Sequence, residues 1–213
     1  MAYHRTMTGT LALLGGGPFV ANDDLDARLL AAAEADRVVV LPTADAFERP
    51  DDLVVAAMTW GERLGVTVEP LMVLQRHDAD NEAMTNAITT ASAVYLVGDS
   101  SQHLRSALKD TAVLRAITGV LERGGLVAAV GPSAAALCDP MLDQRGGAFT
   151  LGLGLAPGMS IIPDAESLSE DALQRTRSLA DTPLVELRSG AAAVRRPDGW
   201  ELVGDVVVHG ELP

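Results

Sequence analysis

Short apolar runs alternate with helix-like segments along most of this 213-residue chain. Five runs show little of the apolar and polar alternation of a half-exposed strand, and they lie near residues 10–15, 37–42, 66–74, 93–98 and 126–131. Nearly continuous apolar runs of this length are typical of strands that are buried on both faces of a sheet. The pattern therefore predicts five parallel strands.

Helix signals fill the gaps between these runs. Residues that cap or begin helices stand before three of the helical patterns, at residues 22–24, 50–52 and 80–82. The long segment after residue 100 ends at a pair of glycines and is predicted to break into two helices near Asp110 and Thr111. Alternation of strands and helices gives right-handed crossovers, so we expect a doubly wound α/β fold whose mostly parallel sheet is flanked by helices.

The last third of the chain has a looser pattern. A polar helix is expected over residues 167–180, and short strands are expected around residues 183–187, 191–196, 200–204 and 205–209. We expect these strands to complete the same sheet as an antiparallel edge, with a turn at residues 197–199. No linker separates this part, so residues 1–213 are interpreted as one domain, with a separate domain of about sixty residues as the alternative.

Composition and charge narrow the classes of partner. The formal net charge is −13, which repels phosphate backbones, so neither nucleic acid nor a membrane is an expected partner. Cys138 is the only cysteine and cannot form an internal disulfide, and the apolar stretch at residues 11–14 is too short for a signal peptide or a membrane span. These features favour a cytoplasmic protein in which Cys138 is a small buried side chain.

Candidate chemistry lies where the predicted strands end. In open α/β sheets the ligand crevice lies at the carboxyl ends of the strands, which here carry glycines 15–17, residues 42–45, residues 98–101 and residues 131–133. The first of these, which contains Gly16 and Gly17, matches neither the G-x-G-x-x-G nor the Walker pattern. A tight turn is the favoured interpretation there, and we expect no cofactor and no metal site.

The stretch LVAAVGPSAAALCDP, residues 126–140, raises a specific alternative. A buried strand followed by a sharp turn, small neighbours and a helix is the setting of a nucleophile elbow, and Ser133 stands where the nucleophile would be. The second flanking glycine of such an elbow is replaced by Ala135. The residues alone leave two interpretations open, a nucleophile on a strained turn and a serine that caps a helix.

Long segments of the chain resemble the peptidase E and cyanophycinase family of serine peptidases, in the class I glutamine amidotransferase-like superfamily. The resemblance rests on LALLGGG, VVVLPTA, AVYLVGDSSQHLRSALKDTAV, GGLVAAVGPSAAALCDPM and GGAFTLGLGLAPG, and it is strongest to an uncharacterised branch of actinobacterial type. It implies a flavodoxin-like fold and a serine hydrolase site. In that site Ser133 would be the nucleophile, and the amides of Gly98 and Ala134 would form the oxyanion hole.

The rest of the family's site does not carry over. The position of the family's catalytic histidine falls at or next to Asp164, and the second residue of the family's glycine pair is Asp99. A carboxylate at that place would oppose a developing oxyanion. His103 remains as an alternative base, although a lone helix histidine is more often structural.

A crevice lined by Gly16, Gly17, Asp99, Ser100 and Asp164 follows from these positions. Clustered carboxylates can bind a cation or an amino group, although loop acids in such an acidic chain are more often merely solvated.

Three functional hypotheses follow. The first is a catalytically degenerate member of the family, with Ser133 retained, that serves as a binding or partner protein. The second is an active serine hydrolase for dipeptide-like substrates with His103 as an unusual base, and the third is a protein that binds a peptide or an amino-acid-like molecule in the same crevice. An exposed late edge strand would support a homodimer.

Overall fold

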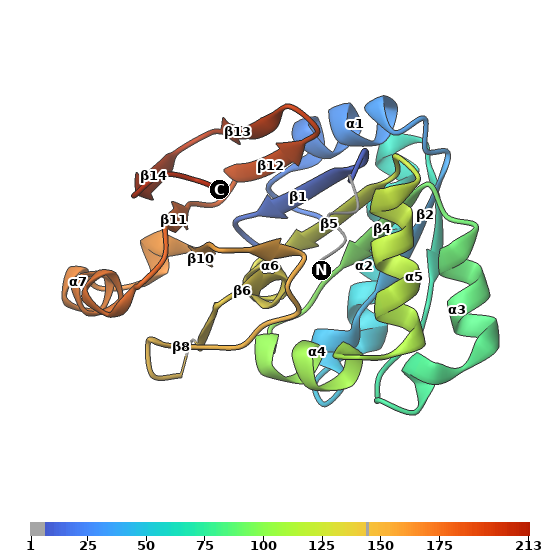
Figure 1. Cartoon of the computed structure of the whole chain (residues 1–213). Helices are drawn as coiled ribbons and strands as arrows, with labels where there is room; N and C mark the ends of the chain where they lie inside the picture. The colour runs from blue at the N-terminus through green and yellow to red at the C-terminus, as the bar shows by residue number, and fades with distance from the viewer. Residues whose placement is uncertain (1–6, 144) are drawn as a thin grey trace.

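A seven-stranded sheet runs through the centre of the computed structural model, which describes residues 7–143 and 145–213 (Figure 1). The strand order is β13-β12-β1-β5-β4-β2-β3. The five predicted strands form its parallel part and are β1 (Thr10–Leu14), β2 (Arg37–Leu41), β3 (Thr67–Pro70), β4 (Ala93–Leu96) and β5 (Leu126–Val130). The prediction of a doubly wound, mostly parallel sheet is confirmed.

Two antiparallel strands complete one edge of this sheet. β12 (Ala192–Arg196) pairs with β1, and β13 (Gly199–Val203) pairs with β12 after the predicted turn. This confirms the expected antiparallel edge for two of the four late strands.

The other two late strands leave the main sheet, contrary to the prediction. β11 (Leu184–Leu187) pairs in parallel with β10 (Ser160–Ile162) and antiparallel with β14 (Val206–His209), which makes a separate three-stranded sheet. All four residues of β11 are buried, so this strand needs a paired neighbour on each side. The short run that forms β10 supplies the second neighbour, and the sequence pattern did not identify it as a strand.

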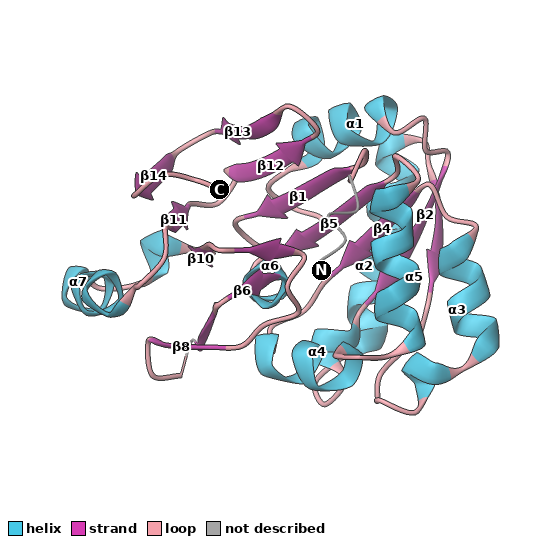
Figure 2. Cartoon of the chain, viewed as in Figure 1, coloured by secondary structure: helices cyan, strands magenta, loops and turns pink. Residues whose placement is uncertain are grey.

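Helices cover both faces of the main sheet (Figure 2). They are α1 (Asp23–Ala32), α2 (Pro50–Leu64), α3 (Glu82–Thr89), α4 (Ser101–Leu108), α5 (Ala112–Glu122) and α6 (Pro132–Leu137). The last helix, α7 (Glu170–Leu179), lies beside the small sheet, where its Leu173 packs with Ile162 and Leu184. Single 3₁₀ turns lie at Thr43–Asp45, Asp78–Asp80 and Ala165–Ser167. Short paired strands between α6 and β10 are β6 (Cys138–Asp139), β7 (Met141–Asp143), β8 (Ala148–Thr150) and β9 (Ala156–Pro157).

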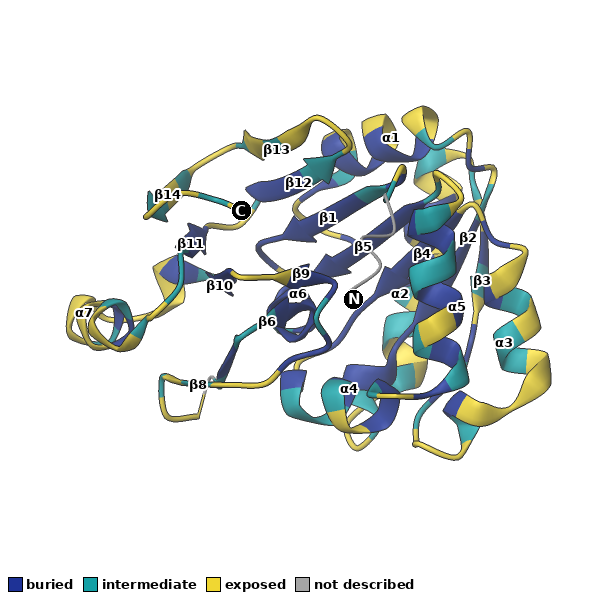
Figure 3. Ribbon diagram, in the orientation of Figure 1, coloured by how far each residue is buried: buried dark blue, intermediate teal, exposed yellow. Residues whose placement is uncertain are grey.

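The core consists of two apolar layers, one on each face of the sheet (Figure 3). Leu29 of α1 and Trp60 of α2 pack on one face, while Ile88 of α3 and Ile117 of α5 pack on the other. All four side chains are buried, which explains the helical spacing of apolar residues in these segments.

The predicted break in the long helical segment is confirmed. Asp110 takes a left-handed backbone with φ of 62°, and the side chain of Thr111 accepts a hydrogen bond from the Leu114 N–H at the start of α5. A helix cannot continue through a left-handed residue, so α4 and α5 become separate elements.

The carboxyl ends of β1 and β5 face the part of the chain that contains α6, β10 and α7 (Figure 1). In the residues that the structure describes, no helix is both long and apolar enough to cross a membrane.

Candidate active site

Ser133 lies in the first turn of α6, directly after β5. The positive φ of this turn belongs to Gly131, with φ of 59° and ψ of −135°, and Gly131 also occupies the N-cap position. A Cβ at Gly131 would stand 3.2 Å from the Gly16 carbonyl oxygen, so glycine suits the close approach of the two loops. Ser133 itself has an ordinary helical backbone, so it is neither the strained residue nor the cap that the sequence suggested.

The hydroxyl of Ser133 is turned inward. The residue is 0% exposed, and its Oγ donates a hydrogen bond to the Gly98 carbonyl oxygen at 2.9 Å. This bond joins the first turn of α6 to the loop that follows β4. The proton that a catalytic base would remove is therefore directed at a backbone carbonyl, which cannot act as a base.

One of the two amides expected to form an oxyanion hole is engaged elsewhere. The Ala134 N–H donates to the Gly131 carbonyl oxygen at 2.9 Å, and Gly98 presents its carbonyl, not its N–H, to Ser133. The Asp99 N–H donates to Asp45 Oδ1 at 2.6 Å. Oxyanion stabilisation needs donors that point at the reacting atom, and these two amides, Ala134 and Asp99, point at other acceptors.

Asp164 occupies a left-handed position after β10, with φ of 62°. Its Oδ1 accepts a hydrogen bond from the Gly16 N–H at 2.6 Å, which ties the loop after β1 to the loop after β10. Burial raises the pKa of the Asp164 carboxyl, the bond from Gly16 opposes that rise, and the charges of Glu166 and Asp99 add to it. The residue at the position where the resemblance implies a histidine therefore joins two loops of the structure.

Asp99 lies beside other carboxylates at the end of β4. Burial raises the pKa of its carboxyl, and repulsion from Asp45 and Glu48 raises that pKa further. The next residue, Ser100, caps α4 by accepting a hydrogen bond from the His103 N–H at 3.2 Å.

His103 is directed at other groups. Its Nε2 lies 2.7 Å from the Leu74 carbonyl oxygen, and its ring meets that of Phe47 edge-on, with 4.7 Å between the centroids. The structure thus places the imidazole against the loop after β3 and an exposed aromatic side chain. It brings Asp99 and Asp164 to one cavity but does not bring His103 to that cavity.

A cavity with a volume of about 620 Å³ lies at the carboxyl edge of the sheet. Asp99, Pro132 and Asp164 line it on the sheet side, and Ala172, Arg175 and Thr176 line it from α7. Ser133 does not line the cavity, because its hydroxyl is buried against the Gly98 carbonyl oxygen. Gly17 is exposed and does not line the cavity, and Gly16 takes part only through its bond to Asp164.

Similarity to known proteins supports the implied family. The sequence model described as peptidase family S51 matches residues 11–142 of the chain, well over half of its length. The chain belongs to peptidase family S51. A search of the curated proteins finds no match.

Two solved structures share the S51 fold with this chain. A peptidase from an acI-B1 actinobacterium superposes with a TM-score of 0.84 at 24% identity, over 97% of this chain and 92% of that one. A putative peptidase E protein from Listeria monocytogenes EGD-e gives a TM-score of 0.69 at 17% identity, over 94% of this chain and 98% of that one. The mixed α/β architecture is therefore that of known peptidases.

The helix α7 forms a wall of the cavity in this S51 chain. The sequence predicted the helix but not its place at the cavity. The buried carboxylate of Glu186 holds this helix, because Arg177 Nε and Nη2 donate to its two oxygens at 2.6 and 2.9 Å. His209 Nε2 lies 2.8 Å from the same carboxylate, and the Arg177 guanidinium is the main cause that lowers the pKa of Glu186. The only sequence signal was the spacing of Ala172, Arg175 and Thr176, which places them on one face of a helix.

Proposed function

We propose that this S51 chain is a non-catalytic member of its family, which has kept the peptidase scaffold and uses its cavity to bind a ligand. The observation that carries the proposal is the bond between Ser133 Oγ and the Gly98 carbonyl oxygen at 2.9 Å, made by a residue with no exposed surface. A serine hydroxyl is a weak nucleophile unless a neighbouring base accepts its proton. A backbone carbonyl accepts the hydrogen bond without accepting the proton.

The surrounding charges support the same proposal. Nucleophilic attack creates an oxyanion, which a carboxylate beside the site destabilises and free amide donors stabilise. Asp99 and Asp164 line the cavity, whereas the Ala134 amide is bonded to Gly131. An enzyme that lacks its base loses several powers of ten in rate, and the unfavourable electrostatics act on top of that loss.

The alternative of an active hydrolase depends on His103. To act as the base, its imidazole would need to reach the Ser133 hydroxyl directly or through one water molecule. The recorded contacts of the ring are to Leu74 and Phe47. This alternative requires the imidazole to leave these contacts and the Ser133 hydroxyl to leave the Gly98 carbonyl oxygen, and we do not favour it.

Covalent labelling tests the proposed function. We expect a fluorophosphonate, which modifies activated serine nucleophiles, to leave the intact mass of the folded protein unchanged after hours of incubation, because nothing removes the Ser133 proton. Intact-mass spectrometry would detect the adduct, and an active serine hydrolase treated in the same way serves as the positive control. A stoichiometric adduct that disappears in Ser133→Ala would refute the proposal.

A further inference from the structure

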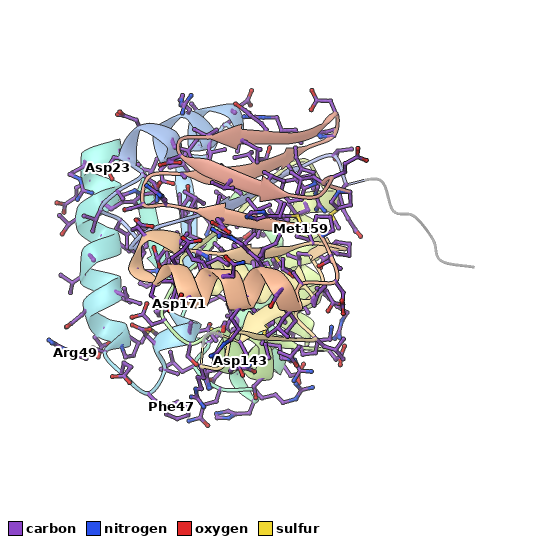
Figure 4. The ribbon with its side chains drawn as sticks, turned by 90° about the vertical axis from the view of Figure 1, so that its left-hand side faces the viewer. Asp23, Phe47, Arg49, Asp143, Met159 and Asp171 are labelled. Carbon is purple, nitrogen blue, oxygen red and sulfur yellow. The ribbon has the colours of Figure 1, made fainter. Side chains whose placement is uncertain are left out.

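Two cavities adjoin at the carboxyl edge of the main sheet. The larger, of about 620 Å³, and a smaller one, of about 210 Å³, are both lined by Asp99 and Arg145. Volumes in this range suit a small molecule of the size of an amino acid or a short peptide. In Figure 4, which looks onto α7, Asp171 and Asp143 mark this side of the molecule, and they line the larger and the smaller cavity respectively.

Carboxylates dominate the smaller cavity and its junction with the larger one. Asp45, Glu48 and Asp143 line the smaller cavity, and Asp99 lies at the junction. The charges of Asp45 and Glu48 both act on Asp99 and raise the pKa of its carboxyl. A cationic group that entered here would relieve this repulsion and gain charge-assisted hydrogen bonds.

The larger cavity also has cationic side chains in its lining. Arg175 lines it from α7, as does Asp171, and Arg145 lies at the junction with the smaller cavity. Within residues 7–143 and 145–213, neither guanidinium group makes a hydrogen bond or an ion pair, whereas nearby Arg177 and Arg188 are paired with Glu186 and Asp205. The side chains of Arg145 and Arg175 are both exposed, so an anionic group that enters the cavity can reach them, and a guanidinium group holds a carboxylate through paired hydrogen bonds.

We propose that the adjoining cavities bind a basic amino acid, free or as the end of a short peptide. Its side-chain ammonium lies among Asp45, Glu48 and Asp99, and its carboxylate is held by Arg175. Asp164, at the floor of the larger cavity, faces the α-amino group. This inference rests on the proposed function, because a ligand that the protein retains must not be cleaved.

Isothermal titration calorimetry with L-lysine and three relatives tests each contact. Nε-acetyl-lysine lacks the side-chain charge, cadaverine lacks the carboxylate, and glutamate reverses the side-chain charge. We expect lysine to bind and both Nε-acetyl-lysine and cadaverine to bind at least about tenfold more weakly, since a hydrogen bond to a charged group contributes about 1.5–3 kcal/mol. Glutamate should not bind measurably, because its side chain would meet the carboxylates.

Matched variants locate the binding. Asp99→Asn and Arg175→Gln should each weaken lysine binding at least about tenfold. The controls Asp181→Asn and Arg115→Gln change exposed residues that line neither cavity, and they should leave the affinity unchanged. Three results would overturn the inference: equal binding of lysine and Nε-acetyl-lysine, tighter binding of glutamate than of lysine, or no binding of lysine up to about 10 mM. A ligand that binds only above this concentration has a binding free energy under about 3 kcal/mol.

A dipeptide separates this inference from the proposed function. Alanyl-lysine should bind and be recovered intact by mass spectrometry after incubation with the protein. If it bound and were cleaved by the wild type but not by Ser133→Ala, the non-catalytic proposal would fail while the ligand class stood. If it neither bound nor was cleaved, the ligand inference would fail while the non-catalytic proposal stood.

Discussion

Replacing Gly98 with alanine should lower the free energy of unfolding by roughly 3 kcal/mol or more. Gly98 has φ of 115°, a conformation that residues with a Cβ rarely adopt. An added Cβ would stand 2.7 Å from the Asp45 backbone nitrogen and 2.9 Å from the Ala44 carbonyl carbon. Both contacts are with backbone, so the turn cannot relieve them by moving a side chain.

Gly17→Ala is the matched control for this experiment. Gly17 is exposed, and a Cβ there would meet no heavy atom within 4 Å, so the change should alter stability by less than about 0.5 kcal/mol. Denaturant unfolding of both variants measures the difference. A loss below about 1 kcal/mol for Gly98→Ala would mean that the loop after β4 takes another conformation, in which the Gly98 carbonyl need not face Ser133.

Replacing Asp26 with asparagine should change how stability depends on pH. Asp26 is 2% exposed and accepts hydrogen bonds from Tyr95 Oη at 2.9 Å and Trp60 Nε1 at 3.1 Å. Burial raises the pKa of its carboxyl from 3.8 to about 6, although both hydrogen bonds oppose the rise. The folded state therefore holds the proton more tightly than the unfolded state between these two values.

The sign of the effect follows from this difference in proton binding. The contribution of Asp26 to stability is fully present below about pH 4 and is lost as the pH rises through about 6. Two pKa units correspond to about 3 kcal/mol. The free energy of unfolding of Asp26→Asn, taken relative to that of the wild type at the same pH, should therefore rise by about 3 kcal/mol between pH 4 and pH 7. The exposed control Asp181→Asn should run parallel to the wild type. A difference between Asp26→Asn and the wild type that stays constant over this range would contradict the assignment.

Much of the fold could be predicted from the apolar pattern. The runs that became β1, β2, β4 and β5 are buried on both faces, whereas β3 lies at the edge of the sheet with only Val68 buried. Residues 110–111 break a helix through a left-handed backbone and a threonine cap. These features act locally or through a regular spacing of apolar residues, so the sequence displays them. The second sheet could not be predicted, because the pairing of β10 with β11 depends on a short strand that carries little pattern of its own.

The place of Ser133 in the fold could be predicted, but the orientation of its hydroxyl could not. Ser133 follows β5 as the apolar pattern indicated, whereas only the resemblance pointed to Asp164, which follows the unpredicted strand β10. The direction of one hydroxyl and of one peptide plane at Gly98 decides what Ser133 can do. The partner of Asp164 is Gly16, which is 148 residues away in the chain. Contacts of this kind depend on how distant loops meet, and no local pattern encodes them.

The free energy of unfolding of Ser133→Ala tests most directly whether this hydroxyl is a structural donor. Removing it leaves the buried Gly98 carbonyl oxygen without this partner, so we expect a loss of about 1–3 kcal/mol. Ser178→Ala, which removes an exposed hydroxyl bonded to the Arg175 carbonyl oxygen, should cost less than about 0.5 kcal/mol. Active-site residues are commonly held at a cost to stability, so an unchanged or higher stability of Ser133→Ala would contradict the structural role and favour a nucleophile.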